Sequence, residues 1–404
     1  MKKKSILLMA ALMMATASIV SCTSSTHEQG FVIEGRLTNV PDSTRIVVFE
    51  NMGNHGLNIA QDTIIEGKFR LAGKTNEEGL RFARIYCYSP KDEFTCISWD
   101  ILCLIPGSKI TIDGTTTDHS EWKIKSNVPA QKTMNLFREQ TQEEYSLMNQ
   151  LCIEHYPLQE AFFDEKRLEQ PMEIQKQMQT ELEGIRASQE SVDNILCRKQ
   201  LNLMAKLPID EVWLHQMRHI TWSKDPQVQK VAKQLCQQLD ASHKMTEDGE
   251  YIMNHFFPSL QVKVGDMVPD IELKDTLGHT HRLKELQGRY VLLDFWRNGC
   301  QPCMMSIPEM GEIAEQMKDS VAVVSISPDD LATWKETTIK HGIKWHNWND
   351  MKGVNGIFAH YQIKGYPTYF LVAPNGKLIA KQVGYSKGSL FKFLKEHTSS
   401  VGKM

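Results

Sequence analysis

Two cysteines separated by two residues, Cys300 and Cys303, follow an apolar run at residues 291–296. A run of this length and composition is typical of a strand buried on both faces, as in a parallel sheet. Gly299 allows the backbone to turn after the strand, and Pro302 falls in the first turn of a helix, where its missing N–H costs nothing. Cys300 then occupies the N-cap position, where free N–H groups favour a thiolate. Cys303 would lie one turn further on, close enough to attack a mixed disulfide formed on Cys300.

Two other uses of this cysteine pair have to be compared with redox chemistry. A zinc half-site would need further ligands at suitable spacing, and the downstream His341, His346 and His360 do not provide it. An inert structural disulfide is an alternative, but two intervening residues after a strand are typical of exchanging thiols. No glycine-rich phosphate loop follows a strand. We therefore predict a redox pair with no metal and no organic cofactor.

The region around the pair resembles the thioredoxin superfamily, and more narrowly the TlpA/ResA-type membrane-anchored thiol:disulfide oxidoreductases. The matching features are Asp-Phe-Trp at 294–296, Cys-Gln-Pro-Cys at 300–303, Pro308, Gly-Tyr-Pro-Thr at 365–368 and the hairpin turn Pro-Asn-Gly at 374–376. They cover about the last third of the chain. The resemblance implies a thioredoxin-like α/β fold, with a mixed sheet flanked by helices.

The same resemblance implies roles for individual residues. Cys300 would attack a substrate disulfide, and Cys303 would resolve the mixed disulfide. Pro367 would follow a cis peptide bond, with Tyr366 and Trp296 beside it as substrate-binding residues. The implied partners are protein or peptide disulfides and an upstream thiol reductant.

Asp294 interrupts an otherwise apolar strand. Burying a carboxylate is costly, so we expect its pKa to be raised and its carboxyl group to exchange protons with the cysteines. It matches the buried acid of thioredoxin, whereas the glutamate that many ResA-type proteins carry three residues after the second cysteine is replaced by Ser306. The alternative is an aspartate paired with a lysine or facing solvent.

The N-terminus combines three lysines with an apolar run at residues 6–17, which is typical of a secretory signal and too short for a membrane span. The residues Ile-Val-Ser-Cys that end at Cys22 resemble a bacterial lipobox, in which the cysteine is lipidated. We predict a signal peptide over residues 1–21, and a lipid anchor with a polar tether over residues 22–30. The protein would then face the periplasm of a bacterial cell envelope. Ordinary secretion is the alternative.

The remaining chain divides into three regions, because 404 residues exceed one ordinary core. Short alternating strands predict an all-β, sandwich-like domain over residues 31–125. Helical spacing predicts a helical region over 126–257, and the thioredoxin-like domain would occupy 261–404. Expected breaks in the helical region are Pro157, Pro171, Pro208 and Pro226. The formal net charge of −3 argues against a nucleic-acid partner.

The other cysteines are expected to be buried thiols: Cys87, Cys96, Cys103, Cys152, Cys197 and Cys236. A bridge between Cys96 and either Cys87 or Cys103 is an open alternative. The sequence thus predicts an exported, lipid-anchored thiol:disulfide oxidoreductase, and the uncharged Gln301-Pro302 pair favours a reductase. The alternatives are a binding or scaffold lipoprotein and a peroxiredoxin-like thiol peroxidase. The peroxidase is disfavoured, because Cys300 occupies the place of the threonine in the Thr-x-x-Cys pattern of a peroxidatic cysteine.

Overall fold

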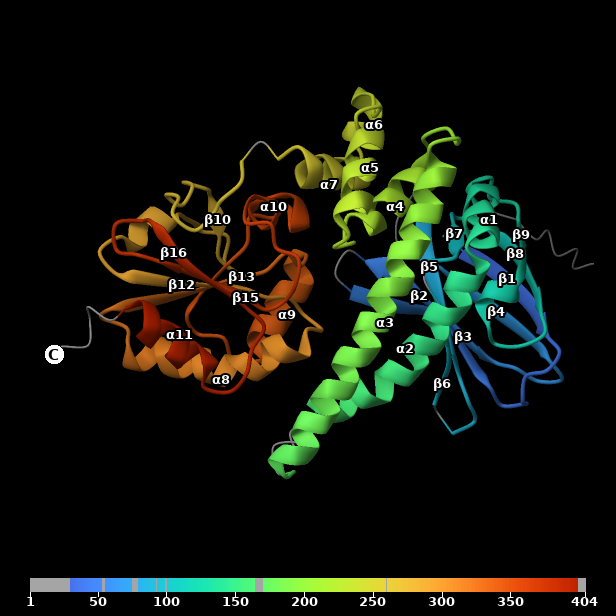
Figure 1. The fold of residues 1–404 in the computed structure, drawn as a ribbon, viewed down its shortest axis with the longest axis horizontal. Helices are drawn as coiled ribbons and strands as arrows, with labels where there is room; N and C mark the ends of the chain where they lie inside the picture. The colour runs from blue at the N-terminus through green and yellow to red at the C-terminus, as the bar shows by residue number, and fades with distance from the viewer. Residues whose placement is uncertain are drawn as a thin grey trace, which may run out of the picture.

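The computed structural model describes residues 30–52, 55–74, 79–91, 93–98, 100–163, 170–258 and 260–398. The expected signal peptide and Cys22 lie outside these ranges. An N-terminal group of strands, a set of helices and a C-terminal α/β part follow one another along the chain (Figure 1). Among the helices described, none combines the length and the apolar composition that a bilayer span requires.

The N-terminal strands form two sheets. One has the order β4-β1-β8-β9, and the other has the order β3-β2-β5-β6, with β7 also paired to β5. The short strands expected over residues 31–125 are present. The bounds are β1 Gly30–Leu37, β2 Arg45–Met52, β3 His55–Thr63, β4 Lys68–Lys74, β5 Arg81–Tyr88, β6 Phe94–Ile97, β7 Leu102–Leu104, β8 Lys109–Gly114 and β9 Lys123–Ser126.

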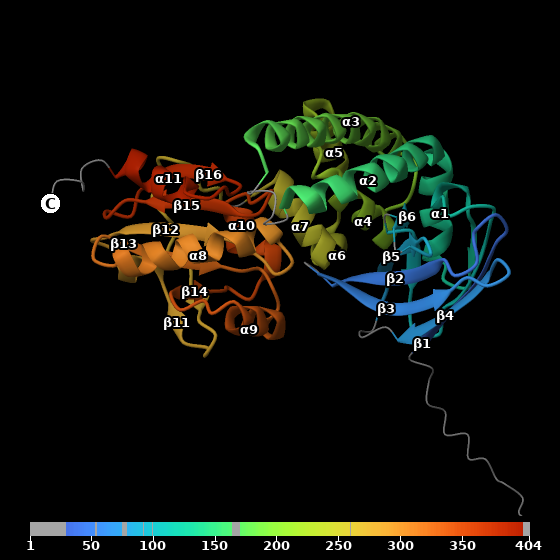
Figure 2. The ribbon, with the colours of Figure 1, turned by 90° about the horizontal axis from the view of Figure 1, so that it is seen from below.

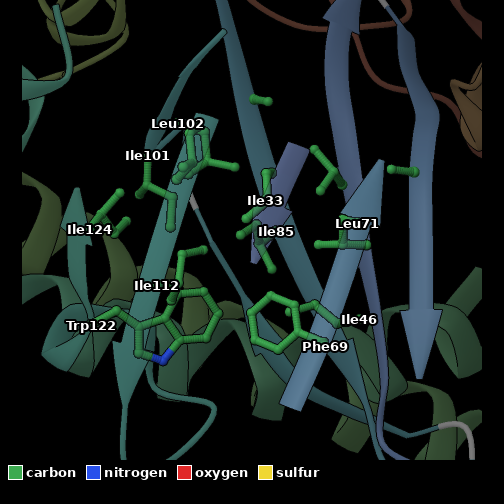
Figure 3. Packing of buried hydrophobic residues seen from close by; sticks show 14 of the residues in the cluster. Ile33, Ile46, Phe69, Leu71, Ile85, Ile101, Leu102, Ile112, Trp122 and Ile124 are labelled. Carbon is green, nitrogen blue, oxygen red and sulfur yellow. The ribbon is translucent and has the colours of Figure 1, made fainter. Parts of the chain in front are cut away.

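Both sheets contribute to one hydrophobic core (Figure 3). Side chains of β1 and β8 alternate in burial: Ile33 and Ile112 are buried, whereas the residues next to them are half-buried or exposed. They meet Ile46 and Ile85 of the second sheet, and Trp122 lies at one end of the core. The expected sandwich-like pattern therefore corresponds to two sheets that bury their apolar faces together.

Within the described residues, the helices that follow are α1 Ala130–Gln140, α2 Gln142–Phe163, α3 Met172–Met204, α4 Glu211–Ile220, α5 Pro226–Cys236, α6 Ala241–Lys244 and α7 Glu247–Phe256. Helices α4, α5 and α7 begin at N-caps: Asp210, Asp225 and Thr246 accept backbone N–H bonds from the first turn. The helices pack on the second sheet, because Cys103 and the half-buried Phe82 belong to their core.

The expectation that Pro157 breaks the helical region is wrong. Pro157 lies inside α2, which continues to Phe163. A proline in a helix removes one backbone hydrogen bond, but α2 packs along α3 as a helical hairpin, and this contact offsets the loss. Pro171 and Pro226 do lie at helix starts, and Pro208 lies between α3 and α4, as expected.

The C-terminal part is built on a mixed sheet of order β14-β13-β12-β15-β16. The central strand β12 is parallel to β13 and antiparallel to β15. The bounds are β10 Leu273–Lys274, β11 Thr280–His281, β12 Tyr290–Phe295, α8 Gln301–Gln316, β13 Val321–Ile326, α9 Leu331–Lys340, β14 His346–Trp348, α10 Ile357–His360, β15 Thr368–Val372, β16 Leu378–Val383 and α11 Ser389–His397.

Figure 2 shows the strands and helices of this part from below. Buried apolar side chains pack on both faces of the sheet, which explains why β12 is a continuous apolar run. Leu292 packs in the layer that contains α8 and α11, whereas Leu293 and Phe295 point into the opposite layer. Because side chains alternate along a strand, Asp294 lies on the α8 face.

Candidate active site

A disulfide bond joins Cys300 and Cys303 at the N-terminus of α8. Cys300 is the N-cap residue, and its sulfur accepts a hydrogen bond of 3.3 Å from the Cys303 backbone N–H. Pro302 lies in the first turn, as expected. The side chain of Cys300 is 8% exposed and that of Cys303 is 2% exposed, so a substrate would reach Cys300 first.

The loop between β12 and α8 is held in place from the end of β13. Gly299 has a φ of +73°, a left-handed conformation that glycine adopts without steric cost. The buried Asp329 carboxylate accepts a 2.8 Å hydrogen bond from the Asn298 backbone N–H and another from the Ser327 hydroxyl group. This anchor fixes the backbone from which Cys300 projects.

Aromatic side chains surround the disulfide. Trp296 and Trp334 form one buried cluster with both cysteines, and Tyr366 packs against it. The two indole N–H groups donate to the same Asn347 side-chain oxygen, at 3.3 Å and 3.2 Å. Asn347 therefore fixes both indole rings beside the sulfur atoms. This role was not predicted from the sequence, because an isolated asparagine has no motif that marks it as a hydrogen-bond acceptor for tryptophans.

The peptide bond between Tyr366 and Pro367 is cis, as expected. The guanidinium group of Arg297 lies over the Tyr366 ring, 5.4 Å from its centroid. Burial raises the pKa of the Tyr366 phenol, and the Tyr251 phenol of α7 adds to this rise. The Tyr366-Pro367 loop thus lies next to the disulfide.

Helix α7 makes direct contact with this end of the C-terminal part. The Asn254 side chain donates a 3.1 Å hydrogen bond to the Asn355 carbonyl oxygen, and α7 packs against α10 (Figure 1). Arg218 of α4 lies over the Tyr251 ring at 4.7 Å. The helical region therefore contacts the C-terminal part at Asn355 and α10, through residues that are distant from each other in the sequence.

Asp294 is 4% exposed and lies between Ser325 of β13 and Tyr369 of β15, its partners in the strand register. The Ser325 hydroxyl donates a 2.8 Å hydrogen bond to Asp294 Oδ2, and the Trp345 indole N–H donates to the same hydroxyl oxygen at 2.8 Å. Asp294 Oδ1 is buried with no hydrogen-bond partner among the described residues. Burial raises the pKa of Asp294 to about 7, although the Ser325 hydrogen bond opposes the rise.

Ser325→Ala is expected to move the Asp294 pKa further above 7, because the ionised carboxylate loses its hydrogen-bond donor. One hydrogen bond to a charged group contributes about 1.5 kcal/mol or more, so the expected shift is about one pH unit. The pH dependence of the Asp294 carboxyl carbon signal in NMR spectra measures it. Ser320→Ala, which removes a hydroxyl bonded only to a backbone carbonyl, is the control. An unchanged titration in Ser325→Ala would contradict this assignment.

The structure brings together the residues expected from sequence: Cys300, Cys303, Trp296 and Tyr366 share contacts, with Pro367 next to Tyr366 and Asp294 on the α8 face of β12. Asp294 is bonded to a serine, so the alternative of a lysine partner or a solvent-facing carboxylate is wrong. Ser306, at the position of the ResA glutamate, donates to the Cys303 carbonyl oxygen at 2.8 Å. The six other cysteines within the described ranges are free thiols, so the alternative bridges at Cys96 are not formed.

Residues 264–381 match the AhpC/TSA family. The thiol-disulfide oxidoreductase ResA of Bacillus thuringiensis (strain Al Hakam) is 30% identical over 142 residues, which are 34% of this chain and 80% of that protein. The thioredoxin-like protein YneN of Bacillus subtilis is 28% identical over 130 residues, which are 30% of this chain and 73% of that protein.

A crystal structure of the thioredoxin domain of a thiol-disulfide oxidoreductase from Bacteroides vulgatus is 28% identical, with a TM-score of 0.30, and the alignment covers 33% of this chain and 99% of that one. The matched residues 264–381 contain the disulfide, Asp294 and the cis-proline loop. Through this C-terminal domain, the chain belongs to the thioredoxin-like thiol-disulfide oxidoreductases of the ResA type.

Proposed function

We propose that the protein is an exported, lipid-anchored reductase of protein disulfides. The observation that carries this proposal is the Cys300–Cys303 pair at the N-terminus of α8, packed against the Tyr366-Pro367 loop. A helix N-terminus stabilises a thiolate. Two neighbouring thiols can reduce a substrate disulfide and form a disulfide with each other. The proposed domains are a sandwich-like β-domain over residues 31–125, a helical region over 126–257 and a thioredoxin-like domain over 261–404.

The reaction would proceed in two exchanges. The Cys300 thiolate attacks one sulfur of the substrate disulfide, the substrate S–S bond breaks, and the released substrate thiolate takes up a proton. The Cys303 thiolate then attacks Cys300, which releases the second substrate thiol and leaves the Cys300–Cys303 disulfide of the structure. An upstream thiol reductant returns two electrons and two protons to the pair.

Asp294 would accept the proton of Cys303 during the second exchange. A carboxyl group with a pKa of about 7 is suited to this role, because it both accepts and returns a proton near neutral pH. Asp294 lies on the face of β12 that α8 covers, and Ser325 holds the carboxylate oriented. Ser306 supports the Cys303 backbone but carries no group that titrates near neutral pH.

The substrate peptide would lie beside Pro367 and Tyr366, with Trp296 forming the other side of the site. An extended peptide can pair there with exposed backbone groups, as an added strand does. The uncharged Gln301-Pro302 pair supports a reducing poise, and the N-terminal sequence up to Cys22 supports export and a lipid anchor at the cell envelope. The protein would then contact the membrane only through that lipid anchor.

A Cys303→Ser variant tests the proposal. It is expected to accumulate a mixed disulfide between Cys300 and the physiological substrate, because the resolving thiol is absent. Mass spectrometry of non-reduced complexes from the cell envelope would identify the attached protein. Cys303→Ser combined with Cys300→Ser is the control and should trap nothing. Trapping that persists in the double variant, or the absence of any adduct in Cys303→Ser, would contradict the proposed reductase.

Tyr251→Ala tests whether α7 contributes to substrate selection. We expect about a fivefold lower kcat/KM for a protein disulfide such as that of insulin, as for the loss of an aromatic contact of about 1 kcal/mol. Turnover of a small aromatic disulfide should not change, because it reaches Cys300 without touching α7. Tyr156→Ala, at an exposed position of α2, is the matched control. Equal effects on both substrates would exclude α7 from substrate selection.

A further inference from the structure

Three potential metal ligands meet between α3 and α4, in the helical region. Asp193 and Cys197 are one turn apart on α3, and His219 lies near the end of α4. One ligand atom from each side chain, a carboxylate oxygen, a sulfur and an imidazole nitrogen, lies within 4.8 Å of the other two. Cys197 is fully buried, whereas Asp193 and His219 are half-buried, so the cluster has access to solvent.

The hydrogen bonds of Asp193 leave its carboxylate poorly satisfied. Its Oδ2 atom accepts the weak S–H donor of Cys197, at 3.7 Å, and its Oδ1 atom is buried with no hydrogen-bond partner among the described residues. A buried acceptor without a partner is costly, and in native proteins it commonly marks a water or an ion. The unpartnered oxygen is therefore an observation independent of the clustering.

The charges around the cluster also favour a cation. The Cys197 thiol donates to the Asp193 carboxylate, so a thiolate at Cys197 would face a second negative charge. The nearby cation Arg84 is already paired with Asp100 at 2.9 Å. A bound divalent cation would remove the repulsion between a thiolate and Asp193.

We propose that Asp193, Cys197 and His219 bind one Zn²⁺ ion. Zinc takes Cys, His and carboxylate ligands in tetrahedral geometry, whereas magnesium and calcium prefer oxygen alone. Binding forms one bond to each side chain, releases the Cys197 proton to solvent, and leaves the fourth position to water. Tetrahedral bonds place ligand atoms roughly 3.3–3.6 Å apart, so the side chains close in slightly around the ion.

The ion would join α3 to α4. His219 follows Arg218, whose guanidinium group lies over Tyr251 and donates to Asp248 at 2.6 Å. The site would thus stabilise α4, against which α7 packs. The prediction of no metal from the sequence considered only possible ligands around Cys300 and Cys303. It did not consider Asp193, Cys197 and His219, which lie on two different helices.

Cobalt(II) is the probe, because its bond to a thiolate gives a charge-transfer band in the near ultraviolet. The full chain is kept with Cys300–Cys303 oxidised, so that this pair cannot bind the ion. We expect one equivalent of Co²⁺ with a thiolate band that Zn²⁺ removes by displacement. Cys197→Ser should abolish the band, and His219→Gln or Asp193→Asn should weaken Co²⁺ binding at least about tenfold.

Cys236→Ser, which alters a buried helical thiol outside the cluster, is the matched control and should keep the band. Circular dichroism shows whether each variant remains folded. If a variant is unfolded, the Co²⁺ titration of the wild-type protein still tests the proposal. No thiolate band in the wild-type protein, or a band that survives in Cys197→Ser, would overturn the zinc site. Neither result bears on disulfide reduction, which uses other cysteines.

Discussion

Cys300→Ser is expected to reduce disulfide reductase activity to the rate of the assay without protein. A serine hydroxyl is not ionised near neutral pH, so no nucleophile remains at the N-cap position of α8. Insulin reduction with a small dithiol as the electron source measures this loss. The fold should not change, because serine can accept the Cys303 N–H bond as the cysteine sulfur does.

Cys236→Ser provides the control for Cys300→Ser and should keep full activity, since it removes a buried thiol of α5. Hydroperoxide consumption should be measured on the same samples. Insulin reduction that persists in Cys300→Ser would exclude the proposed nucleophile. Hydroperoxide turnover well above insulin turnover in the unaltered protein would instead favour a thiol peroxidase.

Asp294→Asn is expected to stabilise the protein at pH 8 and to change its stability little at pH 4. The Asp294 pKa is about 7 in the folded protein and about 3.9 in an unfolded chain. The folded state therefore keeps a proton that the unfolded state releases, and the free energy of unfolding falls as the pH rises from about 4 to about 7. The loss is about 4 kcal/mol above pH 7, and asparagine removes it.

Urea unfolding of both proteins at pH 4 and pH 8 measures this difference. The same variant should resolve the mixed disulfide about a hundredfold more slowly near pH 7, because no carboxylate accepts the Cys303 proton. Rapid quenching separates that step from the first exchange. An equal stability change at both pH values would contradict the raised pKa, and an unchanged resolution rate would remove Asp294 from the mechanism.

The helical hairpin shows where local sequence signals were insufficient. Helix N-caps such as Asp225, followed by Pro226, can be recognised from a few adjacent residues, and the structure agrees. Pro157 carries an equally clear local signal for a break, but α2 continues because α3 packs against it. The stability of that helix comes from contacts that a short stretch of sequence does not contain.

The sequence by itself determined the cysteine pair with its strand and helix, because these depend on neighbouring residues: Gly299 for the turn and Pro302 for the helix start. The cis bond before Pro367 was expected only from the resemblance to the thioredoxin superfamily. Only the tertiary structure decided what surrounds them. The Ser325 partner of Asp294 and the Asn347 acceptor for two tryptophans come from separate strands. Their proximity follows from sheet register and helix packing, which long-range burial of apolar surface decides and local spacing does not encode.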